Sequence, residues 1–121
     1  MNYTSIEQSK KLLELGLSPE SADMYYELIM TDDHEAHYKN PKPSSDVNVN
    51  DNTNIPCWSL KSLLSLYPEI EVESNIETFI CKSYGLEDGE LLKQIKGFDW
   101  IEPTFRMVVW LLENNYIKPI K

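Results

Sequence analysis

Residues 105–112 read Phe-Arg-Met-Val-Val-Trp-Leu-Leu, the longest nearly continuous apolar stretch in this chain of 121 residues. Asp99 and Glu102 form an acidic capping pair just before it, and Pro103 stands in a first helical turn, where proline is tolerated. The pattern predicts a buried helix over residues 100–115.

This helix is apolar nearly all round, so it needs cover on more than one side. We expect Met107 and Trp110 to meet either a second layer of the fold or a partner chain. The predicted inward face consists of four residues: Phe105, Val108, Val109 and Leu112.

Two further helices are predicted before it. Gly16 supplies a left-handed stop for a helix over residues 5–15, which begins at a capping box of Thr4 and Glu7. Another helix is predicted over residues 59–67, where the first serine is a cap and leucines recur at helical spacing.

Residues 70–98 fit two kinds of structure. Ile76, Phe79 and Ile80 have helical spacing, yet the isoleucines also alternate at period two and the stretch is rich in β-branched and aromatic residues. Asp88 and Gly89 are a turn signal in either case. Periodicity alone does not decide between helix and strand here.

Three stretches carry a resemblance: Pro-Cys-Trp-Ser-Leu at 56–60, Trp-Leu-Leu-Glu-Asn-Asn-Tyr-Ile at 110–117, and Leu-Gly-Leu-Ser-Pro-Glu-Ser-Ala-Asp-Met-Tyr-Tyr at 15–26. Together they resemble a family of small uncharacterised proteins of gut anaerobic bacteria, often encoded in prophages or other mobile elements. The resemblance implies a β-meander between the two tryptophan-bearing helices. It implies no activity, and this chain lacks the family's usual Gly/Asp-rich hairpin turns.

Pattern and resemblance together predict an α+β fold, with about three helices and a small antiparallel sheet from residues 70–98. An all-α fold is the alternative. The length favours one domain over residues 1–121. Within it, residues 31–56 hold five asparagines and few large apolar side chains, which predicts a long, mobile polar loop that contacts a partner.

Charge and apolar content exclude several classes of protein. The 20 acidic side chains outnumber the 11 basic ones, so direct binding to nucleic acid is not expected. The longest uninterrupted apolar run, residues 107–112, is far shorter than the ~20 residues of a membrane span, and no membrane association is expected. The first residues show no signal-peptide pattern, and Cys57 and Cys81 have neither CxxC spacing nor disulfide-scaffold density. These features predict a cytoplasmic protein with two reduced, buried cysteines.

No catalytic motif and no cofactor are predicted. His34 and His37 lie three residues apart among acidic neighbours, which suggests a metal site, although no third ligand is marked. The stretch from residue 12 to 38 contains seven acidic residues and no lysine or arginine, which predicts a one-sign patch. We expect partner contacts at six residues of this region: Tyr25, Tyr26, Asp32, Asp33, Glu35 and Tyr38.

The leading functional hypothesis is a non-catalytic accessory protein that acts by binding another protein. The first alternative is an acidic mimic of DNA or an anti-repressor, because a one-sign acidic field steers basic partners. The second is a small metal-dependent enzyme that uses His34 and His37. The sequence assigns neither the partner nor the oligomeric state.

Overall fold

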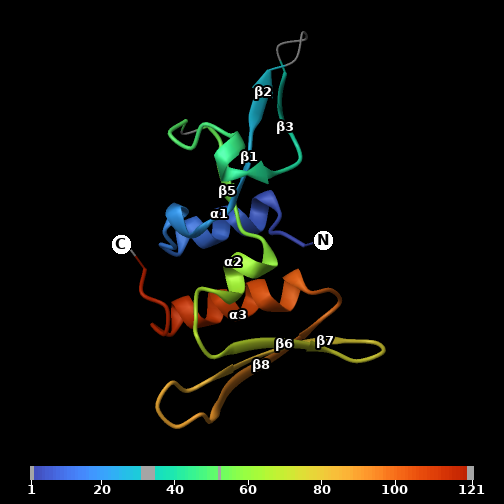
Figure 1. The fold of residues 1–121 in the computed structure, drawn as a ribbon, viewed down its shortest axis with the longest axis vertical. Helices are drawn as coiled ribbons and strands as arrows, with labels where there is room; N and C mark the ends of the chain where they lie inside the picture. The colour runs from blue at the N-terminus through green and yellow to red at the C-terminus, as the bar shows by residue number, and fades with distance from the viewer. Residues whose placement is uncertain (1, 31–34, 52, 120–121) are drawn as a thin grey trace.

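A computed structural model describes residues 2–30, 35–51 and 53–119. It has three α-helices, α1 (Ile6–Glu14), α2 (Leu60–Leu64) and α3 (Ile101–Glu113), together with small antiparallel sheets. Figure 1 shows the helices in the middle of the molecule, with a three-stranded sheet on one side and a hairpin projecting on the other. The predicted α+β fold is confirmed.

The three-stranded sheet is a meander of β6 (Ile70–Ser74), β7 (Phe79–Tyr84) and β8 (Leu91–Gly97). It occupies the stretch whose sequence fits both helix and strand, so the prediction of strands there is confirmed. In the turn of the first hairpin, Asn75 Oδ1 accepts hydrogen bonds from the backbone amides of Glu77 and Thr78. Gly89 has a φ of +69° in the second hairpin, as its turn signal requires.

α3 packs across one face of this sheet and also against α2 (Figure 1). Met107, Val108 and Leu111 are fully buried, whereas Phe105 and Val109 are half-buried. The predicted inward face is therefore wrong at these last two residues, because the sheet and α2 together cover the neighbouring faces of the helix. Within the described residues, no helix is long and apolar enough to cross a membrane.

A second sheet places β1 (Met24–Tyr26) between β4 (Lys42–Pro43) and β5 (Ile55–Cys57). The strand after β1, β2 (Leu28–Met30), pairs with β3 (Ala36–Tyr38) as the projecting hairpin of Figure 1.

The segment 31–56, predicted to be a loop, therefore carries three short strands and a 3-10 turn at Ser44–Asp46. The prediction of a loop is therefore wrong for the described part of this segment. Hydrogen bonds of polar side chains help to stabilise it. The Asn54 side chain accepts from the Leu28 amide and donates to the Asn48 carbonyl oxygen. Such pairing needs no apolar periodicity, which explains why the sequence pattern missed it.

The N-terminal segment joins the two halves of the fold. The Thr4 hydroxyl lies 2.8 Å from Ser9 Oγ and accepts a hydrogen bond from the Trp58 amide at 3.0 Å. The capping box of α1 consists of Ser5 and Gln8, one residue beyond the predicted pair, because the Thr4 side chain is turned into the core. This buried hydroxyl ties α1 to the strand that precedes α2.

Asp23 provides a second tie between the halves. Its carboxylate accepts hydrogen bonds from the Ser59 amide at 3.0 Å and from the Ser59 hydroxyl at 2.5 Å. Burial opposes ionisation and raises the pKa of Asp23, but these bonds outweigh it, so the pKa lies below its ordinary value of 3.8. Asp23 follows η1 (Pro19–Ser21), and Ser59 is the N-cap of α2, so these hydrogen bonds hold the end of η1 close to the start of α2.

Candidate functional site

The histidine pair predicted as a metal site is described only in part. His34 lies outside the described residues, and His37 lies on the exposed strand β3, with its Nε2 3.4 Å from Glu35 Oε2. In the described ranges, no group of three or more His, Cys, Asp or Glu side chains could hold a metal ion. The metal hypothesis gains no third ligand from this part of the chain.

Two of the predicted partner-binding residues are buried. Tyr25 and Tyr26 are each 7% exposed, because β1 is the central strand of its sheet. The Tyr26 hydroxyl donates to the Thr4 carbonyl oxygen at 2.6 Å, and burial raises the pKa of Tyr26. Both side chains therefore lie inside the fold in this structure and not on its surface, where a partner contact would be made.

Of the other predicted contact residues, the two that the structure describes lie on or next to the projecting hairpin. Asp32 and Asp33 fall outside the described residues, whereas Glu35 and Tyr38 are exposed. The Tyr38 hydroxyl donates to the Thr53 carbonyl oxygen at 3.1 Å, so this ring braces the hairpin against the segment before β5. Partner contact at Glu35 and Tyr38 stays a prediction.

Both cysteines are free and fully buried, as predicted. Burial raises the pKa of Cys57 to about 11 and that of Cys81 to about 12. A nucleophilic cysteine needs a lowered pKa and access to solvent, so neither thiol has the properties of a catalytic nucleophile.

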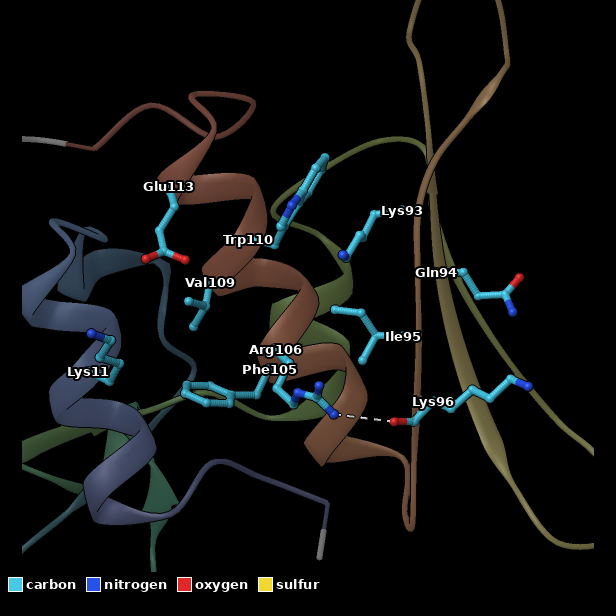
Figure 2. Close-up of a pocket in the computed structure, with 10 residues that line it drawn as sticks. All are labelled: Lys11, Lys93, Gln94, Ile95, Lys96, Phe105, Arg106, Val109, Trp110 and Glu113. Carbon is cyan, nitrogen blue, oxygen red and sulfur yellow. Dashed lines mark hydrogen bonds between the residues drawn. The ribbon is translucent and has the colours of Figure 1, made fainter.

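A hollow of about 460 Å³ lies where α1, α3 and β8 meet, and we call it the α3 groove. Figure 2 shows that α3 forms its floor, α1 one wall and β8 the other. It is lined by ten residues: Lys11, Lys93, Gln94, Ile95, Lys96, Phe105, Arg106, Val109, Trp110 and Glu113.

The floor of the groove is apolar and aromatic. Phe105 and Val109 lie on the side of α3 nearer α1, and Trp110 lies on the side nearer β8 (Figure 2). All three are half-buried and pack against the main core from outside. The indole of Trp110 stacks on Tyr116, with ring centroids 5.5 Å apart and planes at 16°. The groove therefore leaves a pre-formed aromatic surface partly uncovered.

The rim of the groove is cationic. It gathers the side chains of Lys11, Lys93 and Arg106, with Glu113 as the acidic residue among the ten, whereas Lys96 lines the groove from β8 with its side chain pointing away from α3 (Figure 2). The ammonium group of Lys93 lies 5.9 Å from the Trp110 ring centroid, in a cation–π arrangement. The groove is therefore locally positive, although the chain as a whole has a net charge of -9.

Arg106 connects the floor to the β8 wall. Its Nη1 donates to Glu102 Oε1 at 3.2 Å and, at 3.4 Å, to the carbonyl oxygen of Lys96. Figure 2 shows that carbonyl pointing from β8 toward the guanidinium group. Both bonds are exposed, and the second is long, so a ligand could replace it at small cost.

The sequence prediction missed this groove. Its cations come from residues 11, 93 and 106, and only the packing of α3 between α1 and β8 brings them together. One signal pointed toward it: the all-round apolar character of α3 required a second covering layer or a partner chain at Trp110.

Comparison of the chain with protein-family models, with curated proteins and with solved structures finds no match.

Proposed function

We propose that this protein is a non-catalytic accessory protein that binds an acidic segment of another protein in the α3 groove. The observation that carries the proposal is the cluster of three cations, Lys11, Lys93 and Arg106, around a half-buried aromatic floor on a strongly acidic chain. Aromatic and arginine side chains in a hollow are typical anchors of protein interfaces.

Charge selects the kind of partner. At physiological ionic strength the Debye length is about 8 Å, so a bound segment responds mainly to the charges that line the groove. A short run of carboxylates would meet the three cations there. A longer polyphosphate chain would extend beyond the groove over a surface whose net charge is negative. The proposal therefore names an acidic polypeptide rather than a nucleic acid.

The two buried cysteines support a reducing compartment for this function, because neither is paired in a disulfide. A cytoplasmic location is part of the proposal.

Titration with a hexaglutamate peptide, followed by ¹H–¹⁵N NMR, tests the proposed function. We expect chemical-shift changes confined to β8 and the exposed face of α3, and weaker binding as salt is raised. Lys93→Glu should weaken binding by about tenfold, which corresponds to about 1.4 kcal/mol, because it replaces an attraction for the bound carboxylates with a repulsion.

Lys61→Glu is the matched control, because Lys61 lies exposed on α2 and does not line the groove. It should leave binding unchanged. Absence of shifts, or shifts at the β2–β3 hairpin in place of the groove, would contradict the proposal. Binding of hexalysine in preference to hexaglutamate would instead support the acidic-mimic hypothesis.

A further inference from the structure

We infer that the α3 groove takes its acidic partner as an added β-strand, paired to the free edge of β8. This inference rests on the proposed function and adds the mode of binding and the sequence pattern of the partner. β8 is the last strand in the order β6-β7-β8, so its outer edge has no strand beside it in the described residues.

The hydrogen-bond register identifies the backbone groups at that edge. The Tyr84 amide donates to the Glu69 carbonyl oxygen, so even-numbered residues of β7 turn their backbone groups toward β6. The odd-numbered residues of β7 face β8 and pair with Lys93, Ile95 and Gly97.

The backbone N–H and C=O groups of Gln94 and Lys96 consequently face outward. The bond from Arg106 to the Lys96 carbonyl oxygen agrees with this assignment, because that oxygen is turned away from β7. Edge groups that side chains cover only weakly are a template for strand addition.

The helix beneath the sheet extends beyond its last strand. Phe105, Val109 and Trp110 lie on the α3 face that forms the floor of the groove, Trp110 on the side nearer β8 and the other two on the side nearer α1 (Figure 2). All three are half-buried. A strand added about 4.8 Å beyond β8 would lie over this face. It would cover the side chains of the groove floor that lie nearest β8.

The geometry of a strand then sets the partner's sequence pattern. Alternate side chains point to opposite faces, so apolar side chains at every second position would meet α3. The intervening positions would share the outer face of the sheet with Gln94 and Lys96, whose side chains point away from α3 in Figure 2. Acidic residues at these positions would pair with Lys96, and an acidic end of the segment with Lys93 or Lys11.

The same charges argue against a second copy of β8 as the occupant. A second β8 strand at this edge would add its own Lys93 and Lys96 to those already present, and this concentration of like charge opposes such a pair. The inference therefore commits to an acidic, alternating, extended segment of another protein.

The test uses a heptapeptide, Glu-Val-Glu-Val-Glu-Val-Glu with blocked ends, and two N-methylated forms of it. One form is N-methylated on the three valine amides, at positions 2, 4 and 6. The other is N-methylated on the glutamate amides at positions 3, 5 and 7. In an added strand, only one of these sets donates hydrogen bonds to β8. One methylated peptide should therefore lose affinity by about tenfold or more in calorimetry, and the other by less than about threefold.

Hydrogen exchange provides a second readout on the intact protein. Binding of the unmethylated heptapeptide should slow exchange of the Gln94 and Lys96 amides, while the Ile95 amide, already bonded to β7, should change little. A peptide that docks as a helix or as a flexible chain would leave the Gln94 and Lys96 amides unprotected and overturn the inference. Equal affinities of all three peptides would also overturn it, as would self-association of the protein that blocks the β8 edge.

Failure of this inference is distinguishable from failure of the proposed function. Loss of hexaglutamate binding removes the proposed function and the inference with it. If hexaglutamate binds in the groove but the two N-methylated peptides bind equally well, only the inference of an added strand fails.

Discussion

Thr4 holds the N-terminal segment in place through one buried hydroxyl. Thr4→Val keeps the shape of the side chain but leaves the Trp58 amide and the Ser9 hydroxyl without this partner. We expect the free energy of unfolding to fall by about 1–3 kcal/mol, the cost of unsatisfied buried polar groups. Urea denaturation followed by circular dichroism measures it. Thr4→Ser keeps the hydroxyl and should lose less; a Thr4→Val variant as stable as Thr4→Ser would contradict the assigned role.

Asp23 makes stability depend on pH in the acid range. Its pKa is lowered in the folded protein, so its stabilising contribution is present above the unfolded value, near 3.8, and is lost as the pH falls through the lower folded value. Asp23→Asn should therefore be less stable than the wild type at pH 7, and the difference should shrink below pH 3.8. Urea midpoints at both pH values measure this.

Asp46→Asn is the control for that experiment, because Asp46 lies exposed in the 3-10 turn of residues 44–46. It should show a smaller pH-dependent difference. A difference between Asp23→Asn and the wild type that is constant from pH 7 to pH 3 would assign the effect to packing rather than to the carboxylate.

At the scale of a helix, two neighbouring valines of α3 separate folding from binding. Val108 is fully buried, so Val108→Asp places an unpaired charge in the core at a cost of several kcal/mol against a total stability of about 5–15 kcal/mol. We expect it to abolish the cooperative unfolding transition. Val109 is half-buried on the groove floor, so Val109→Asp should keep the fold and weaken hexaglutamate binding.

Circular dichroism and the hexaglutamate titration together check this pair. Loss of the fold in Val109→Asp would restore the inward face predicted from the sequence. Unchanged hexaglutamate binding by a folded Val109→Asp variant would show that the groove floor is not the binding surface.

The sequence predicts elements well where a local signal marks an end. Gly16 has a φ of +94°, Ser59 caps α2 through the Ser62 amide, and Asp99 accepts from the first amides of α3. These signals act within a few residues, so they are readable in one dimension. Which face of a helix is buried depends on elements that are distant in the sequence. The local pattern therefore could not show that Val109 lies at the edge of the buried face.

The strands of the second sheet carry no such local signal. They are two or three residues long, too short to show a period, and polar contacts such as that of Asn54 stabilise their pairing. The groove brings together residues more than 80 positions apart, such as Lys11 on α1 and Lys93 on β8. Its separate parts were visible in the sequence, whereas their juxtaposition required the packing of α3.

At the scale of the whole molecule, the two ends of the fold differ in how much core they share. The meander and the three helices pack around one large apolar cluster, whereas the β2–β3 hairpin projects from the molecule and is exposed along β3 (Figure 1). Local opening is easiest where few buried apolar contacts must be broken. We therefore expect the hairpin to open independently of the core.

Native-state hydrogen exchange measures this difference. The bonded amides of β2 and β3 should exchange at a free energy well below that of global unfolding, and those of β7 near the global value. Tyr38→Phe removes the bond to the Thr53 carbonyl oxygen and should increase hairpin exchange further without changing β7. Equal protection of the hairpin and β7 would mean that both belong to one cooperative unit.

The cation–π contact in the groove also makes the protein its own optical probe. Its three tryptophans have different surroundings: Trp58 is fully buried and bonded to Ser21, Trp100 lies edge-on to Phe79, and Trp110 lies under Lys93. A ligand that displaces the ammonium group and covers the indole alters the emission of Trp110 and its access to a soluble quencher. Intrinsic fluorescence can therefore report occupancy of the groove without a label, and loss of that signal in Trp110→Phe would assign it.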